Sequence, residues 1–473
     1  MPLFSRRRFL ASAAAVAAAS ALPLAGRARA QAIATHRLAA RPARVTLIGP
    51  PHPDTEVWAY NGTTPGPVLR VRQGDRLRVE VANALEADTT VHWHGIRLPH
   101  AMDGVPHLTQ PPIRPGESFV YEFECADAGT FWYHPHAESA EQLGRGLYGA
   151  LIVEEREPVP VDRDLTWVLS DWRLDPTGAI VDNFGDLHDA SHDGRLGNTV
   201  TINGRIPETF AVRAGERLRL RLINVANARI FALDFADHAP AIVALDGHPV
   251  APHAPPEGRI VLGPGMRADI VLDCNGRPGS RATVADRFPR ADVYRVVDLV
   301  YAEAPAVERA QPLAPVALPA NPVAEPDLGH AVRHAFTFGG GMMGTLRTAQ
   351  LDGRRVDMRT LMQNGFAWAV NGAVERVHAH KPLVTLKRNA STIFEFVNDT
   401  AWWHPIHLHG HTFRVVSQNG RPTRHREWRD TVLLPPRERA EVAFVADNPG
   451  DWMLHCHVLE HQASGMSSVI RVA

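Results

Sequence analysis

The sequence predicts an all-β protein built from three β-sandwich domains in series, and an internal repeat is the main reason for this prediction. Residues 71–83 recur at 212–224 with apolar side chains at the same alternate positions, and a weaker third copy runs from 386 to 398. A period of two is typical of a strand buried on one face. An Asn-Gly pair, which predicts a turn, precedes each copy: Asn61-Gly62, Asn203-Gly204 and Asn371-Gly372.

The repeat also sets the expected domain boundaries. We expect the first domain at residues 36–155, the second at 161–302 and the third at 334–473. A Pro- and Ala-rich stretch at 303–328 predicts an extended linker between the second and third domains. The 38 prolines and 36 glycines suit an all-β chain with many turns.

Residues 1–30 are expected to be a targeting segment rather than part of the fold. The stretch Ser5-Arg6-Arg7-Arg8-Phe9-Leu10 resembles a twin-arginine export signal, and Ala28-Arg29-Ala30 offers a cleavage site before Gln31. The apolar run between them is too short and too rich in alanine for a membrane span. We therefore expect a periplasmic or secreted protein with no stable membrane span after cleavage.

Composition excludes some partners. The 473 residues carry a formal net charge of −1, so nothing favours nucleic acid or an electrostatic membrane contact. Three cysteines are an odd number, which forbids a full disulfide framework; Cys125 and Cys274 could pair across domains, but we expect two unpaired, buried thiols. We expect a monomer.

The strongest single motif is His455-Cys456-His457, near the C-terminus. Successive side chains of a strand point to opposite faces, so the two histidines project one way and the cysteine the other. His461 and Met466 follow shortly. A thiolate with imidazoles and a weak axial methionine is the ligand set of a blue-copper electron-transfer site. A buried cysteine between ordinary histidines would not explain the histidine pairs elsewhere.

Those other pairs fall at equivalent places in the first and third domains. In these two domains one His-x-His begins nine residues beyond the last Asn of the repeat, Asn83 or Asn398, and another begins five residues beyond Gly129 or Gly450. The pattern predicts that each domain supplies half of one metal cluster. The four pairs are His92/His94, His134/His136, His407/His409 and His455/His457.

The second domain lacks these pairs, since Leu233 and Phe235 stand where a His-x-His would fall. We therefore expect a metal-free spacer or a structural wall. Residues 174–197 predict a long loop in this domain. Its His188 and His192 could bind a metal, but we expect solvated loop side chains.

The complete set of motifs resembles the multicopper oxidases, a laccase-like family with three cupredoxin domains, which are Greek-key β-sandwiches. The resemblance covers essentially the whole chain after the signal. It rests on four motifs: His92-Trp-His-Gly, Trp132-Tyr-His-Pro-His, His404-Pro-Ile-His-Leu-His-Gly-His411 and His455-Cys-His-Val-Leu-Glu-His461.

The resemblance implies four copper ions and their ligands, and it leaves His411 without a copper. Type 1 copper would take His404, Cys456, His461 and axial Met466. Type 2 copper would take His92 and His407. The binuclear type 3 pair would take His94, His134 and His457 on one ion, and His136, His409 and His455 on the other.

The implied activity is oxidation of a small reductant, one electron at a time, coupled to reduction of dioxygen to water. The reductant could be a phenol or aromatic amine, or cuprous ion. A modest methionine-rich set, Met342, Met343, Met358 and Met362, is typical of metal oxidases but also fits a flexible loop with core methionines. A non-catalytic copper-binding scaffold and a copper nitrite reductase are alternatives, although no cluster ligand is missing.

Two acids are candidate catalytic residues. Asp103 resembles the acid that supplies protons beside the copper cluster, and its alternative is a turn aspartate before glycine. Asp430 resembles the acid that hydrogen-bonds a type 1 histidine, and its alternative is a solvated loop acid. The chain departs from many bacterial members at Gln462, where they carry a proton-relaying glutamate.

Overall fold

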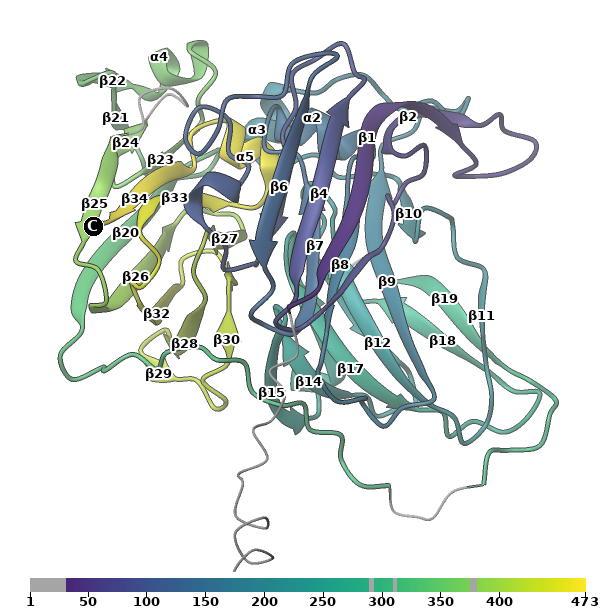
Figure 1. The fold of residues 1–473 in the computed structure, drawn as a ribbon. Coiled ribbons are helices and arrows are strands. Elements are labelled where there is room, and N and C mark those ends of the chain that lie inside the picture. Colours follow the sequence, from purple (N-terminus) through teal and green to yellow (C-terminus); the bar gives the residue numbers. More distant parts are fainter. Residues whose placement is uncertain (1–30, 289–292, 309–312, 375–380) are drawn as a thin grey trace, which may run out of the picture.

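The computed structural model describes residues 31–288, 293–308, 313–374 and 381–473, so the expected export signal at 1–30 lies outside the described residues. Strands dominate this part of the chain, with only short helices. Three β-sandwiches form the molecule, with the third at the left of Figure 1, the first in the upper centre and the second at the lower right. The described residues include no helix long and apolar enough to cross a membrane.

The first sandwich consists of two four-stranded sheets. Its elements are β1 (Ile33–Val45), β2 (Thr55–Tyr60), β3 (Leu69–Arg72), β4 (Arg76–Asn83), β5 (His92–His94), η1 (His100–Met102), β6 (Ser118–Glu124), β7 (Gly129–His134), α2 (Ser139–Gly144) and β8 (Gly149–Glu154). The strand orders are β2-β1-β4-β6 and β3-β8-β7-β5. Strand β4 buries Leu77, Val79 and Val81 completely, as the alternation in the sequence predicts.

The second sandwich has a core of its own. Its elements are β9 (Arg163–Trp172), α3 (Leu187–Ser191), β10 (Thr199–Ile202), β11 (Thr209–Val212), β12 (Arg217–Asn224), β13 (Phe231–Asp234), β14 (Ala241–Leu245), β15 (His248–His253), η2 (Pro256–Gly258), β16 (Arg259–Leu262), β17 (Arg267–Asp273), β18 (Arg281–Asp286) and β19 (Tyr294–Tyr301). The sheets run β10-β9-β12-β17-β14-β15 and β11-β19-β18-β13-β16. The expected loop at 174–197 contains the short helix α3.

The third sandwich contains the remaining elements. These are β20 (Val332–Gly340), β21 (Thr348–Leu351), β22 (Arg354–Asp357), α4 (Met358–Gln363), β23 (Trp368–Val370), β24 (Ala373–Val374), β25 (Pro382–Leu386), β26 (Ser391–Asp399), β27 (His404–Leu408), β28 (Phe413–Gln418), β29 (Arg421–Pro422), β30 (Trp428–Arg429), β31 (Thr431–Leu434), β32 (Arg439–Val445), β33 (Gly450–Cys456), α5 (Leu459–Ala463) and β34 (Ser467–Val472). One sheet is β22-β21-β24-β23-β20-β26-β32-β28-β29, with β30 beside β28, and the other is β25-β34-β33-β27-β31.

The stretch between the second and third sandwiches has no helix or strand in its described residues, 303–308 and 313–331. It is nevertheless attached to the first sandwich. The side chain of Asn321 donates to the carbonyl oxygen of Ala128 at 2.8 Å and accepts from its amide at 2.9 Å. Extended conformation here follows from a composition rich in Pro and Ala, which cannot build a packed core.

Candidate metal centre

Three side chains of the third sandwich meet at the Cys456 thiol, and we call them the thiolate cluster (His404, Cys456 and His461). Cys456 ends β33, His404 begins the neighbouring β27, and His461 lies on α5. The sulfur lies 3.4 Å from Nδ1 of His404 and 3.7 Å from Nδ1 of His461, and the two nitrogens are 3.2 Å apart. All three side chains are fully buried. One thiolate and two imidazoles at this spacing are the donor set of a blue-copper site.

The far nitrogens of the two imidazoles are hydrogen-bonded, which leaves both Nδ1 atoms for a metal. Nε2 of His404 lies 2.8 Å from the hydroxyl of Thr400, and Nε2 of His461 donates to the carbonyl oxygen of His192 at 2.8 Å. Such partners fix the tautomer of a metal-binding histidine. Burial lowers the pKa of His461 to about 3, so the ring is a neutral ligand. Burial also raises the pKa of the Cys456 thiol, an effect that a bound cation opposes.

Met466 lies next to this cluster. Its backbone amide donates to the carbonyl oxygen of His461 at 2.9 Å, and its own carbonyl accepts from the amide of Cys456 at 3.0 Å. The side chain is fully buried. These two bonds hold the backbone of Met466 beside Cys456 and His461.

Eight other buried histidines, which we call the histidine group, gather where the first and third sandwiches meet. Within each sandwich a strand pair aligns them: His92 lies opposite His134 on β5 and β7, and His407 opposite His455 on β27 and β33. The members are His92, His94, His134, His136, His407, His409, His455 and His457.

Ring stacking joins the two halves of the histidine group. The ring of His92 stacks on that of His409 with centroids 3.9 Å apart, and His94 stacks on His407 at 3.8 Å. Ligand nitrogens lie within 4.8 Å of one another in three sets that share members: His92/His94/His134, His92/His407/His409 and His136/His409/His455. Two of the three sets combine side chains from both sandwiches, so the group is complete only when the sandwiches are together.

Unsatisfied nitrogens show that the histidine group fits metal ions. Buried polar atoms in native proteins almost always have hydrogen-bond partners. Seven buried ring nitrogens here have none within the described part of the chain: Nε2 of His92, His134, His136 and His407, Nδ1 of His94, and both nitrogens of His457. Neutral imidazole nitrogens are good ligands for copper.

In four of these histidines a backbone carbonyl oxygen accepts a hydrogen bond from Nδ1, on the side of the ring away from Nε2. Each Nδ1–H donates to a carbonyl oxygen and so leaves Nε2 free for a metal. Burial lowers the pKa of His455 to about 3, which keeps that ring neutral. The bonds are His92 to Asp103 (2.8 Å), His134 to Pro135 (3.0 Å), His407 to Asp430 (2.9 Å) and His455 to Cys456 (2.9 Å).

Asp103 connects histidines of the two sandwiches. Its Oδ2 accepts from Nδ1 of His409 at 2.8 Å, while its Oδ1 lies 3.2 Å from Nδ1 of His92. Its side chain is only 1% exposed. The residue is thus a carboxylate inside the histidine group, and not a solvated turn residue.

Asp430 lies elsewhere than the sequence suggested. We expected it beside a histidine of the thiolate cluster, but its Oδ1 is 3.1 Å from Nε2 of His94 in the histidine group. The reason is the register of β31, which runs antiparallel to β27 with Thr431 opposite His407. Asp430 therefore lies at the end of β27 that is remote from His404. Sequence spacing alone could not reveal this register.

One contact of the thiolate cluster comes from an unexpected place. His192 was expected to be a solvated loop residue, and His188 is indeed exposed, but His192 is half-buried and its carbonyl holds His461. Any residue type can supply a backbone carbonyl, so the sequence carries no signal for this contact. His411 is buried, and its Nδ1 donates to the carbonyl of His409 at 3.2 Å.

The other two cysteines do not contribute to these sites. Cys125 and Cys274 are both free and buried, which confirms the prediction of unpaired thiols. Burial raises the pKa of both thiols to about 12, so they are unreactive in the folded protein.

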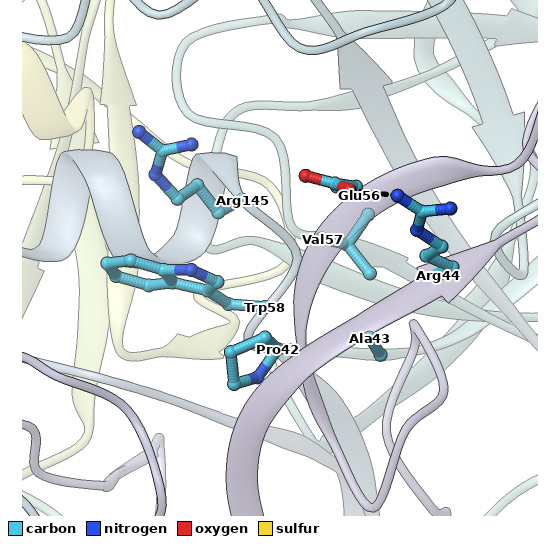
Figure 2. Close-up of a pocket in the computed structure, with 7 residues that line it drawn as sticks. All are labelled: Pro42, Ala43, Arg44, Glu56, Val57, Trp58 and Arg145. Carbon is cyan, nitrogen blue, oxygen red and sulfur yellow. Dashed lines mark hydrogen bonds and ion pairs between the residues drawn. The ribbon is translucent and has the colours of Figure 1, made fainter.

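A surface hollow of about 400 Å³ lies on the first sandwich, between β1, β2 and the end of α2 (Figure 2). The guanidinium of Arg145 lies 5.1 Å from the ring centroid of Trp58. The charged side chains that line the hollow are already paired, because Arg44 bonds Glu56 and Arg145 bonds Glu141 at 2.7 Å. The hollow has no electrostatic feature that would select a ligand.

Three β-sandwiches, a buried thiolate cluster and an adjoining histidine group define a copper oxidoreductase of the cupredoxin-like class. Family models for multicopper oxidases match residues 44–158, 163–298 and 352–473. The chain belongs to the multicopper oxidase family. Its cofactors are type 1, type 2 and binuclear type 3 copper, and dioxygen is its electron acceptor.

Individual relatives agree over nearly the whole chain. Multicopper oxidase MmcO of Mycobacterium tuberculosis is 32% identical over 98% of this chain and 96% of its own. A multi-copper oxidase from Pseudomonas thermotolerans is 39% identical, with a TM-score of 0.82 over 94% of this chain and 100% of its own. A laccase-like oxidase, CueO from Ochrobactrum sp., described as acting on lignin model compounds, is 25% identical, with a TM-score of 0.78 over 94% and 99% of the two chains.

Proposed function

We propose that the chain is an oxidase of cuprous ion, with four copper ions bound by the residues that the sequence motifs indicate. The thiolate cluster, with Met466, would hold type 1 copper, and the 3.2–3.7 Å spacing of the His404, Cys456 and His461 ligand atoms supports this assignment. Bound copper would supply one-electron acceptance at this site and four-electron reduction of dioxygen to water at the histidine group.

The histidine group would hold the remaining three ions. Support comes from its unsatisfied nitrogens and from the orientation of each ring by a partner on the opposite edge. We assign His92 and His407 to type 2 copper. The type 3 pair takes His94, His134 and His457 on one ion, and His136, His409 and His455 on the other.

The polypeptide backbone links the thiolate cluster directly to the histidine group. His455 and His457 of the histidine group flank Cys456 of the thiolate cluster in the sequence. The three residues are fully buried, so the connection between the sites runs through the protein interior. Their consecutive positions give a short connection of covalent bonds between a reductant-facing site and a dioxygen-facing site.

The methionine pocket carries the proposal of cuprous ion as the reductant. We give this name to a cavity of about 380 Å³ whose sulfur-bearing side chains are Met342, Met343, Met358 and Met362. Met358 and Met362 are four residues apart on α4, so they share one helix face. Met342 and Met343 are 44% and 70% exposed, so both side chains can be reached from solvent. Thioethers are soft ligands that select Cu(I).

The methionine pocket lies close to the thiolate cluster. Ser191, at the end of α3, lines the pocket, and its carbonyl accepts from the amide of Met342 at 2.8 Å. The next residue, His192, bonds His461 through its carbonyl. Trp368 closes the same region, with its ring centroid 4.3 Å from that of His461. A cuprous ion held in the pocket would therefore be one short segment of chain away from a type 1 ligand.

An aromatic reductant is the second candidate. The relative from Ochrobactrum sp. that acts on lignin model compounds favours it. The half-buried Trp402, whose ring centroid lies 5.3 Å from that of His192, offers a flat apolar surface near the methionine pocket.

Oxygen uptake with each reductant decides between the two candidates. The double variant Met342→Leu/Met343→Leu keeps the apolar volume but removes two sulfurs. We expect the KM for cuprous ion to rise while the rate with a simple phenol stays the same. Equal effects on the two reductants, or none on cuprous ion, would contradict the proposal.

We further propose that the protein acts in the periplasm after twin-arginine export, as the sequence of residues 5–10 indicates. Replacing both Arg6 and Arg7 by Lys should leave the protein in the cytoplasm, with its signal uncleaved. Cell fractionation followed by immunoblotting measures this. Normal export of the double variant would exclude the twin-arginine route.

A further inference from the structure

The second sandwich, which carries no histidine of either cluster, contacts the histidine group through the turn before β17. Gly265 in this turn lies against two rings. A Cβ atom at this position would come within 2.8 Å of Cδ2 of His457 and within 3.0 Å of Cε1 of His94. Its φ of +82° also belongs to the left-handed region that favours glycine. The turn therefore packs tightly against both rings and leaves no room for a side chain at position 265.

Arg267, two residues further on, contacts all three sandwiches. It is fully buried at the start of β17. Its Nε donates to the carbonyl of Thr130 in the first sandwich at 3.1 Å. Its two terminal nitrogens bond the two oxygens of Asp430 in the third sandwich, at 2.8 and 2.7 Å. Its own backbone amide donates to Asp246 at 2.9 Å, which anchors it in the second sandwich.

The bidentate pair fixes the orientation of the Asp430 carboxylate. One of its oxygens also accepts from Nε2 of His94 at 3.1 Å and from the hydroxyl of Thr431 at 2.8 Å. A carboxylate held by both terminal nitrogens of a guanidinium accepts hydrogen bonds, so Nε2 of His94 carries the proton in this contact.

This arrangement makes His94 different from its neighbours. Because Nε2 is the donor, the lone pair of the ring is on Nδ1, and Nδ1 is the nitrogen without a partner among the described residues. His92, His134 and His407 have the opposite arrangement, with Nδ1 bonded and Nε2 free. In His94 the N–H is on Nε2 rather than Nδ1, and the Asp430 carboxylate is the acceptor that this N–H needs.

We propose that residues 263–267 of the second sandwich are a positioning element for the copper cluster. Arg267 holds Asp430 so that His94 presents Nδ1 to copper, and Gly265 limits the tilt of the His94 and His457 rings. The second sandwich is then part of the oxygen-reducing site. This inference does not depend on which reductant the enzyme uses.

Arg267→Lys tests the proposal with little risk to folding, because lysine keeps the buried positive charge but cannot bond both oxygens of Asp430. We expect weaker copper binding at the histidine group, by about 10–100-fold, as for other partners of metal-binding histidines. The near-ultraviolet absorption of the type 3 copper pair, to which His94 and His457 are assigned, should change, while the blue absorption of type 1 copper stays. Asp430→Asn, which leaves the volume unchanged, should show the same pattern.

Arg219→Lys is the matched control. Arg219 is also fully buried in the same sheet, and it bonds Asp269 at 2.6 Å and Glu155 at 2.7 Å. We expect normal copper content and an unchanged type 3 absorption. The proposal is overturned if Arg267→Lys and Asp430→Asn both keep the parental type 3 absorption and copper content, or if Arg219→Lys alters them equally.

Discussion

Replacement of Asp103 by Asn separates the two halves of the catalytic cycle. The carboxylate accepts from His409 at 2.8 Å and lies 3.2 Å from Nδ1 of His92. Asparagine has the same size but only one acceptor oxygen. Whichever way the amide turns, its NH₂ group faces the N–H of one of the two histidines.

The expected magnitude follows from these two contacts. Converting a charged hydrogen bond to a neutral one costs about 1 kcal/mol, and turning a donor toward a donor costs about another 1 kcal/mol. If the reaction with dioxygen bears the full 2 kcal/mol, it slows roughly 30-fold. Loss of a buried proton source would slow it further, because general acids contribute about 10²–10⁴-fold. Reduction of type 1 copper should be unchanged, since Asp103 contacts no member of the thiolate cluster among the described residues.

Stopped-flow absorption measures the two half-reactions separately: bleaching of the blue colour by reductant, and its return with dioxygen. Asp127→Asn is the control, because Asp127 is a buried carboxylate of the same sandwich that bonds Arg97 at 2.7 and 3.0 Å. Only the Asp103 variant should slow the return of colour. Equal slowing of both half-reactions, or an equal effect in the control, would refute the reasoning.

Three further substitutions have distinct expected outcomes. Cys456→Ser should abolish the blue absorption and oxidase turnover while the histidine group still binds copper, and a variant that stays blue would exclude the type 1 assignment. Gln462→Glu should speed the reaction of the reduced enzyme with dioxygen in stopped-flow, because the amide nitrogen of Gln462 lies 3.5 Å from Nδ1 of His136, and a carboxylate there can accept and pass on a proton, which the amide cannot. An unchanged rate would mean that position 462 has no part in this step. Trp368→Phe removes the donor that bonds the carbonyl of Ala190 at 2.6 Å, so the free energy of unfolding in denaturant should fall by about 1–3 kcal/mol, and an unchanged value would show that this bond does not stabilise the protein.

The sequence predicted those features that repeat or that follow strand periodicity. Alternation at Leu77, Val79 and Val81 gave the buried face of β4, and the spacing from Asn83 and Asn398 aligned histidine pairs of the first and third sandwiches. These features are local, since a strand of known period determines which face each side chain occupies.

Other features depend on contacts between distant segments, and the sequence did not reveal them. The carbonyl of His192 reaches a histidine 269 positions away, and Arg267 bonds an aspartate 163 positions away. Neither has a spacing rule, because the docking of one sandwich on another decides both. Asp430 was expected at the wrong cluster for a different reason: the register of β31 on β27, within one sheet of the third sandwich, determines its position.

The interface position of the histidine group has a consequence for how the protein matures. Its stacked ring pairs each combine one histidine from the first sandwich with one from the third. Copper binding and association of these domains are therefore one coupled equilibrium. A ligand that binds only the assembled form stabilises it by about 2.7 kcal/mol when present at a hundred times its dissociation constant. Copper supply during biogenesis thus determines how firmly the first and third domains are held together.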